Sequence, residues 1–215
     1  ISDRRGQPFV QINCGAFTDE LILSELFGHQ RGAFTGASTD RVGLLETANG
    51  GTLFLDEVDA LSPKAQVSLL RYLQEGEIRP IGSNKVKNVE VRVISATNKD
   101  TKELVEKDLL RQDLMYRLDI LNVTMPPLRR RGEDIQLLAQ YYLAQLAMEE
   151  GHSGKYLSTE IIDELSRYPW PGNVRELETT IRRAFLMTDS EYICDLSYLF
   201  PDHNFEDEIE VAEEE

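Results

Sequence analysis

The sequence predicts an α/β protein in which a parallel sheet flanked by helices is followed by a small all-helical subdomain. Four short apolar stretches are typical of strands: residues 9–12, 52–55, 89–96 and 120–125. Helical patterns separate them, and strands that alternate with helices favour a parallel sheet. After Pro126 and Pro127 the apolar spacing is helical only, which predicts the second subdomain.

The helix signals are local. Ser62 and Pro63 suit an N-cap and a first turn, and Gly76 suits the stop of the same helix. Helical spacing over 135–146 and 159–167 predicts two helices of the subdomain. A third begins near Asn173, which we expect to cap the helix while Glu176 reaches back.

Composition limits the kind of protein. The 215 residues carry a formal net charge of −15, and the stretch 195–215 contains acidic residues but no Lys or Arg. Such a chain repels phosphate backbones, which disfavours DNA binding by this segment itself. No apolar run approaches the roughly 18 residues that a membrane helix needs. The two cysteines, Cys14 and Cys194, have no metal-ligand spacing, and we expect a reducing cytoplasm.

Two acidic residues end the second predicted strand. Residues 50–57 have the sequence Gly-Gly-Thr-Leu-Phe-Leu-Asp-Glu, so Asp56 and Glu57 lie at a strand's carboxyl end, where parallel sheets bind ligands. ATP hydrolysis needs one carboxylate to hold magnesium and a second to orient the attacking water. Asp56 suits the first role and Glu57 the second. The alternative for the pair alone is two solvent-facing acids at a strand end.

Four further polar residues have two interpretations each. Asn98, after the strand 89–96, could touch a γ-phosphate or be a turn residue. Arg111 and Arg117 could be arginine fingers for a neighbouring subunit's nucleotide or surface residues paired with acids. Arg175 lies in the first turn of a helix, where the dipole mildly disfavours a cation; it could sense phosphate or pair with a nearby acid.

A glycine-framed loop carries an aromatic residue. The hexapeptide consists of Gly32, Ala33, Phe34, Thr35, Gly36 and Ala37. Glycine permits tight turns with positive φ, and an aromatic at the tip of such a loop usually marks a protein contact. The alternative is that the ring folds back onto its own domain.

Together these motifs resemble the central domain of sigma-54-dependent transcription activators, a branch of the AAA+ ATPases. The resemblance extends to about residue 200, and the hexapeptide 32–37 is the family's hallmark. It implies an AAA+ P-loop-type sheet with a lid, binding ATP and Mg. Roles follow by position: Asp56 and Glu57 match the Walker B pair, and Asn13 the residue that restrains the catalytic glutamate. Asn98 matches sensor I, Arg111 and Arg117 the fingers, Arg175 sensor II, and 32–37 the loop that touches sigma-54.

Other implications concern neighbouring features. The stretch 81–88 resembles a second surface loop that supports the first, and His29 is interpreted as structural. Residues 59–61 and Leu110 depart from the family's usual residues.

The largest departure is a missing motif. No G-x-x-x-x-G-K-[ST] phosphate loop occurs in the chain. In the family this loop lies just before the position that corresponds to residue 1 of this chain. The strand that leads into the loop lies between the two strands that correspond to residues 89–96 and 120–125. Omitting that strand leaves a gap of about 4.8 Å, one strand spacing. We therefore expect the sequence to be a piece of a longer protein. The intact protein is expected to be an ATPase, and this piece alone, without the phosphate loop, is expected to be inactive.

The resemblance predicts an ATPase core over 1–127, a helical lid over 128–200 and a disordered acidic tail over 201–215. It implies a hexameric or heptameric ring that remodels sigma-54 RNA polymerase and reaches DNA through a helix-turn-helix domain outside this chain. Two alternatives remain open: a degenerate AAA+ module that does not hydrolyse ATP, and another AAA+ remodelling ATPase.

Overall fold

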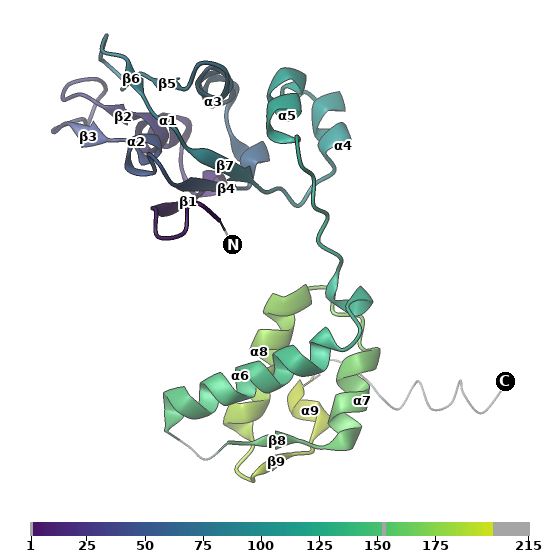
Figure 1. Ribbon diagram of the computed structural model, residues 1–215. Helices are drawn as coiled ribbons and strands as arrows, with labels where there is room; N and C mark the ends of the chain where they lie inside the picture. Colours follow the sequence, from purple (N-terminus) through teal and green to yellow (C-terminus); the bar gives the residue numbers. More distant parts are fainter. Residues whose placement is uncertain (1, 152–153, 200–215) are drawn as a thin grey trace. The chain divides into compact units, whose positions relative to one another are not determined.

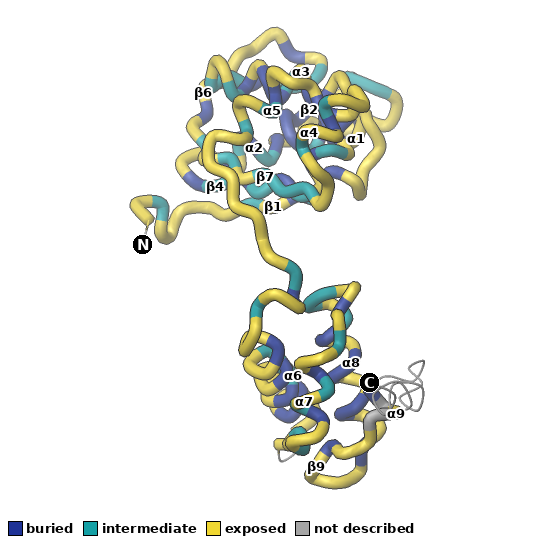
Figure 2. Tube along the Cα trace, turned by 90° about the vertical axis from the view of Figure 1, so that its right-hand side faces the viewer, coloured by how far each residue is buried: buried dark blue, intermediate teal, exposed yellow. Residues whose placement is uncertain are grey.

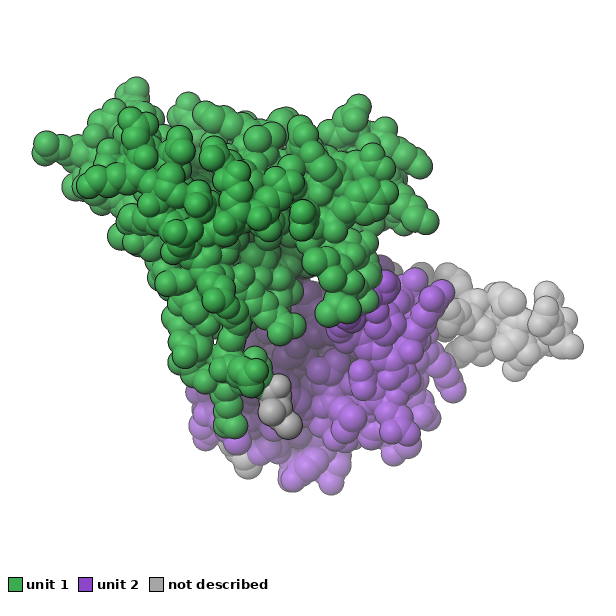
Figure 3. All heavy atoms as spheres, turned by 45° about the horizontal axis from the view of Figure 1, so that its top comes forward, with its two compact units in different colours: residues 1–122 green, residues 123–215 purple. Residues whose placement is uncertain are grey.

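The computed structural model describes residues 2–151 and 154–199 (Figure 1). The chain divides into two compact units, residues 1–122 and 123–215, which Figure 3 colours separately. Each unit has its own hydrophobic core, visible as buried positions along the trace in Figure 2.

A three-stranded parallel sheet forms the centre of the first unit. Its strands are β1 (Phe9–Asn13), β4 (Thr52–Asp56) and β7 (Arg92–Ser95), in the order β1-β4-β7. One face of the sheet is buried: its side chains Leu53 and Leu55 have no exposed surface. The opposite face leaves Phe9 and Ile94 exposed. The parallel α/β prediction is confirmed.

Helices of this unit pack with the buried face of the sheet in one hydrophobic core. The α-helices of this unit are α1 (Asp19–Phe27), α2 (Leu44–Thr47), α3 (Pro63–Glu75), α4 (Thr101–Glu106) and α5 (Gln112–Leu118). Two 3₁₀ turns lie after these strands: η1 (Cys14–Ala16) follows β1 directly, and η2 (Val58–Ala60) follows β4 after one residue, Glu57. The predicted limits of α3 are confirmed: Ser62 Oγ accepts from the Ala65 amide, and Gly76 ends the helix at φ 69°.

Two short antiparallel pairs lie beside the main sheet. They are β2 (Gly28–His29) with β3 (Arg41–Val42), and β5 (Glu77–Ile78) with β6 (Lys87–Asn88). Each pair closes a surface loop, residues 30–40 and 79–86. An isolated parallel bridge between His29 and Ile81 joins the bases of the two loops.

Two strand predictions need correction. Residues 120–125 form no strand, and Ile120 and Leu121 are 76% and 85% exposed. A strand needs a hydrogen-bonded neighbour, and the one expected here is the phosphate-loop strand, which this sequence does not contain. The strand predicted over 89–96 starts only at Arg92, because the Val89 amide donates to the Gly76 carbonyl instead.

The second unit is a helical bundle with one small strand pair. Its elements are η3 (Leu128–Arg130), α6 (Asp134–Glu150), β8 (Tyr156–Leu157), α7 (Thr159–Arg167), α8 (Asn173–Met187), β9 (Tyr192–Ile193) and α9 (Leu196–Leu199). The three predicted helices are confirmed, whereas the parallel β8-β9 pair was not predicted. Trp170 and Phe185 are among the largest buried side chains of the core.

The predicted capping arrangement of α8 is wrong for Asn173 and correct for Glu176. Asn173 is the first helical residue, with φ 53°, and Gly172 is the N-cap. The Asn173 side chain instead accepts from the Leu128 amide at 2.8 Å, which ties η3 to α8. Glu176 does reach back, because its Oε2 accepts from the Gly172 amide at 2.7 Å.

Within 2–151 and 154–199, no helix has the length and apolar character required to cross a membrane. The predicted disordered tail, 201–215, lies outside the described residues.

Candidate functional site

The carboxyl edge of the sheet gathers several of the predicted residues. Asn13 and Asp56 are register partners at the ends of β1 and β4. Beyond them the Ala96 amide donates to the Leu55 carbonyl at 2.8 Å, and the Val58 amide donates to the Ala96 carbonyl at 3.0 Å. The loops that follow β4 and β7 are therefore held side by side.

Glu57 has an unusual backbone. Its φ of 52° and ψ of 50° lie in the left-handed region, which a side chain other than glycine's rarely adopts. Its amide donates to Asp56 Oδ1 at 3.0 Å, and its carboxylate reaches the turn after β1. A Cβ built on Gly15 would collide with Glu57 Oε2 and would lie 3.3 Å from Asn13 Oδ1. Glu57 and Asn13 thus face the same small space beside Gly15.

Asn13 is held by the turn that it starts. Its Oδ1 accepts from the Gly15 amide at 2.8 Å, so the side chain caps η1. The amide nitrogen of the same side chain makes no hydrogen bond that would direct it elsewhere among the described residues. The oxygen of the Asn13 side chain is therefore engaged by its own turn, on the side that faces Glu57.

Cys14 reports the electrostatics of this edge. Burial raises the pKa of its thiol to about 12, and the negative charges of Asp56, Glu57 and Asp59 act in the same direction. Cys14 is 1% exposed, and its thiol remains neutral at physiological pH. Of these three carboxylates, Asp59 is paired with Lys99, so Asp56 and Glu57 are the charges at this end of the sheet that a cation would neutralise.

Asp59, to which the sequence motifs assign no role, holds the two residues on either side of Asn98. Asp59, in η2, accepts from Thr97 Oγ1 at 2.6 Å and pairs with Lys99 Nζ at 2.8 Å. Burial tends to raise the pKa of Asp59, but the hydrogen bonds from Lys99 and Thr97 outweigh it and lower that pKa. Asn98 itself is exposed between its two anchored neighbours.

The two candidate finger arginines lie on another element. Arg111 precedes α5, and Arg117 lies in its last turn; both are exposed. The Arg111 guanidinium pairs with Asp113 at 2.8 Å, which lowers the pKa of that carboxyl. The buried amide of Gln66, on α3, accepts from the Arg111 amide at 2.9 Å. Like Asp59, Gln66 holds a candidate site segment in place and was not indicated by the sequence motifs.

Arg175 belongs to the second unit, in the first turn of α8. Its side chain is exposed and makes no ion pair within the part of the chain that the structure describes. The alternative, in which Arg175 pairs with a nearby acid, therefore finds no partner among these residues.

The hexapeptide loop has the backbone that its glycines predict. Gly32 and Gly36 have φ of 81° and 102°, and the Gly32 amide donates to the Ala37 carbonyl at 2.8 Å. Phe34 is half-buried: its ring lies edge-on to the His29 ring, with centroids 5.0 Å apart. It is not part of the hydrophobic core, and the following Thr35 is exposed.

The second surface loop contacts the first. The Gln30 amide donates to the Ile81 carbonyl, and the Ile81 amide donates to the Gly28 carbonyl, each at 2.9 Å. A Cβ on Gly82 would lie 2.8 Å from the Ala33 Cβ, so the two loops touch there. His29, predicted to be structural, is buried and bonds Ser24 Oγ through Nδ1 at 2.6 Å.

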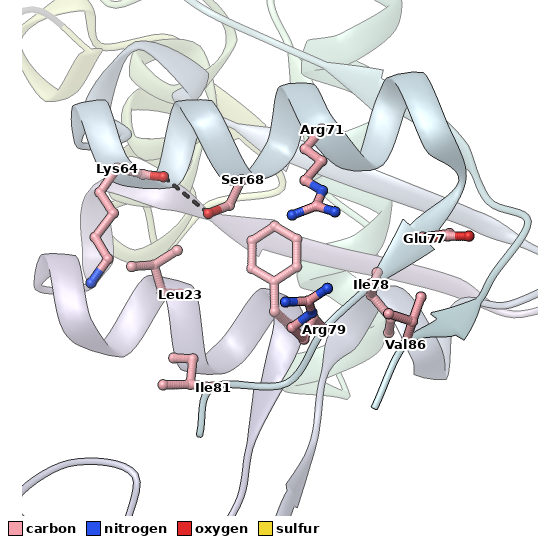
Figure 4. Close-up of a pocket in the computed structure, with 10 residues that line it drawn as sticks. Leu23, Lys64, Ser68, Arg71, Glu77, Ile78, Arg79, Ile81 and Val86 are labelled. Carbon is pink, nitrogen blue, oxygen red and sulfur yellow. Dashed lines mark hydrogen bonds between the residues drawn. The ribbon is translucent and has the colours of Figure 1, made fainter. Parts of the chain in front are cut away.

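A hollow of about 270 Å³ lies under this junction, between α1, α3 and the β5-β6 loop (Figure 4). Leu23, Ile78 and Ile81 contribute apolar walls, and Lys64 and Arg79 contribute charge. None of the sheet-edge residues lines it. It is separate from the candidate nucleotide site.

The donor set at the sheet edge suits magnesium bound together with a nucleotide. Magnesium usually takes one or two protein carboxylates and keeps waters or phosphate oxygens as its other ligands. Among the described residues no cluster of three or more His, Cys, Asp or Glu forms a cage for a metal. Asp56, with Oδ1 engaged by the Glu57 amide, is the carboxylate that fits.

A parallel sheet with Asp-Glu at its carboxyl edge, a polar residue in the loop after the next strand and a helical second unit are together typical of an AAA+ core. Comparison with protein families agrees. Residues 1–124 match the sigma-54 interaction domain, and residues 129–213 match the AAA+ ATPase lid domain. The chain belongs to the sigma-54 interaction domain family, which confirms the resemblance predicted from the motifs.

Relatives of the chain are transcription regulators by name. It is 48% identical over 202 residues to the phenol regulator MopR of Acinetobacter guillouiae, covering 94% of this chain and 36% of that protein. It is 46% identical to the transcriptional regulatory protein XylR of Pseudomonas putida, covering 93% and 35%. The chain thus spans about a third of the length of these relatives.

Solved structures share the fold. NtrX from Brucella abortus has a TM-score of 0.83 at 29% identity, over 98% of this chain and 50% of that one. NtrX in complex with ATP has a TM-score of 0.78 at 32% identity, over 86% and 40%.

Proposed function

We propose that this chain is the mechanochemical part of a sigma-54-dependent transcription activator. Its protomers would form a ring, hexameric or heptameric, that hydrolyses ATP and remodels the closed complex of sigma-54 RNA polymerase in the cytoplasm. The whole protein would reach DNA through a separate helix-turn-helix domain.

One observation carries the proposal. Asn13, Asp56 and Glu57 meet at one edge of the sheet, and the loop bearing Asn98 is joined to that edge by the hydrogen bond from Val58 to Ala96. Two independent acids on a surface would not require one of them, Glu57, to adopt a left-handed backbone. The strained backbone at Glu57 supports a functional placement of its carboxylate.

The residues have separable roles in this scheme. Asp56 would hold magnesium, which supplies neutralisation of phosphate charge when bound. Glu57 would orient the attacking water and accept its proton, and Asn13 would restrain Glu57 until the nucleotide is in place. Asn98 would sense the γ-phosphate, and Arg175 would sense it from the lid.

The arginines of α5 would act in trans. Arg111 and Arg117 are both exposed, so they are accessible to a neighbouring protomer. A finger that stabilises transition-state charge is worth about 10³ to 10⁵ in rate. Because Arg111 is paired with Asp113, that pair would open when the finger reaches the nucleotide.

The loop 32–37 would transmit the nucleotide state to sigma-54. Phe34 rests on His29, whose backbone bridges to Ile81, so the contact loop moves with the second loop. The exposed Thr35 and the half-buried ring offer an amphipathic tip for a protein partner.

The test uses the full-length protein that contains this segment. Wild type should hydrolyse ATP, and Glu57→Gln should bind ATP but hydrolyse it at least about 100-fold more slowly, the scale of a lost general base. Glu75→Gln, which removes an exposed ion pair with Arg71, is the matched control and should hydrolyse normally. Wild type without turnover would instead support the degenerate module.

A further inference from the structure

Asp59 is a nearly buried carboxylate with no place in the roles described so far. Its side chain is 6% exposed, although it lies in a surface turn three residues after Asp56. Burying a charge is costly unless it is paired and hydrogen-bonded. The side chains that bond to it, Thr97 and Lys99, both come from the loop after β7.

Those partners enclose Asn98. Thr97 Oγ1 donates to Asp59 Oδ1 at 2.6 Å and accepts from the Lys99 amide at 3.2 Å. Lys99 Nζ lies 2.8 Å from the other carboxylate oxygen, Asp59 Oδ2. One carboxylate therefore holds the residue before Asn98 and the residue after it, each through a different oxygen.

Among the described residues the two loops have one other hydrogen-bonded link, from the Val58 amide to the Ala96 carbonyl. That bond fixes the separation of the loops but stops two residues short of Asn98. Without Asp59, the bend at 98–99 would keep only the local bond between Thr97 Oγ1 and the Lys99 amide.

We propose that Asp59 is a positioning residue for hydrolysis: it sets the direction of Asn98 relative to Glu57 by fixing both neighbours of Asn98. Glu57 and Asp59 lie on the same short turn, so a shift of Glu57 is transmitted to Asn98 through this carboxylate. The inference depends on the proposed ATPase function, because Asn98 has no task without a γ-phosphate.

A purely structural ion pair is the competing explanation, and a double-mutant cycle separates the two. In the full-length protein, Asp59→Ala should lower kcat about tenfold and change KM for ATP less than about twofold, since binding precedes positioning. If Asp59 acts through Asn98, the double variant Asp59→Ala with Asn98→Ala should be no slower than Asn98→Ala alone. Multiplying effects would overturn the inference.

Conservative variants sharpen the cycle. Asp59→Asn keeps an acceptor for Thr97 and should recover activity to within about threefold of wild type. Lys99→Met removes only the ion pair and should be intermediate between wild type and Asp59→Ala. Glu75→Gln again serves as the control with unchanged kcat and KM.

A measurement without nucleotide covers the case in which wild type is inactive. In this chain Asp59→Ala should speed hydrogen exchange of the Lys99 amide about tenfold, because that amide's acceptor Thr97 loses its anchor. Unchanged exchange would reject the positioning role, even if hydrolysis is observed. Absent wild-type hydrolysis together with faster exchange would reject the proposed function and confine Asp59 to holding the bend.

Discussion

Gln66 connects three segments of the first unit through one buried side chain. Its Nε2 donates to the carbonyls of Leu61 and Leu109 at 2.9 and 2.8 Å, and its Oε1 accepts from the Arg111 amide at 2.9 Å. The side chain is 2% exposed. The segment that carries the candidate finger is therefore attached to α3 by this amide.

Gln66→Met keeps the length of the side chain and removes all three hydrogen bonds. The bond to Leu61 is buried, and a buried carbonyl without a partner costs about 1–3 kcal/mol. The other two bonds are partly buried, so water can replace them in part, at about 0.5–1 kcal/mol each. The sum is about 3 kcal/mol, which corresponds to a loss of roughly 10 °C in Tm for a unit of this size.

Urea denaturation of the chain measures this loss. Circular dichroism follows both units, whereas the single tryptophan, Trp170, lies in the second unit and its fluorescence reports that unit. Gln66→Met should shift the first-unit transition and leave the fluorescence transition in place. Val67→Ala, at the neighbouring half-exposed position, is the control and should cost less than about 1 kcal/mol. A Gln66→Met variant within about 0.5 kcal/mol of wild type would refute the reasoning.

Three further predictions concern other parts of the chain. In the full-length protein Thr35→Ala should spare ATP hydrolysis and abolish sigma-54 binding; lost hydrolysis would mean that the loop is misinterpreted. Trp170→Ala should destabilise the second unit by about 3–5 kcal/mol in thermal denaturation, since the ring is fully buried and its Nε1 donates to the Leu165 carbonyl. Because burial raises the Cys14 pKa, the folded chain keeps a proton that the unfolded chain releases, so stability should fall as pH rises from about 9 towards 12. At pH 8, iodoacetamide should label the exposed Cys194 and not Cys14; equal labelling would contradict this burial.

Local signals explain what could be predicted from the sequence. The limits of α3 depend on Ser62, Pro63 and Gly76, which act within one turn of the helix end. Residues 52–55 form a strand because its apolar side chains have a sheet neighbour on each side. Residues 120–125 are equally apolar but have no strand beside them, so the same local signal fails there.

The unpredicted parts of the site depend on contacts between distant segments. Asp59 binds residues about 40 positions away, and no spacing rule relates an acid in one loop to a threonine in another. Gln66 left a faint signal, because a polar residue three positions before Leu69 interrupts the apolar face of α3. Buried polar residues at such places are satisfied by partners that only the tertiary structure reveals.

The backbone at Glu57 connects these observations. A left-handed residue other than glycine costs on the order of 1 kcal/mol, so the surrounding structure must hold it. The bonds from Glu57 to Asp56 and from Val58 to Ala96 hold it on either side. Relaxing Glu57 to an ordinary conformation would displace the turn that contains Asp59, and with it both neighbours of Asn98. The acid that would activate water and the amide that would sense phosphate thus lie at two ends of one hydrogen-bonded unit.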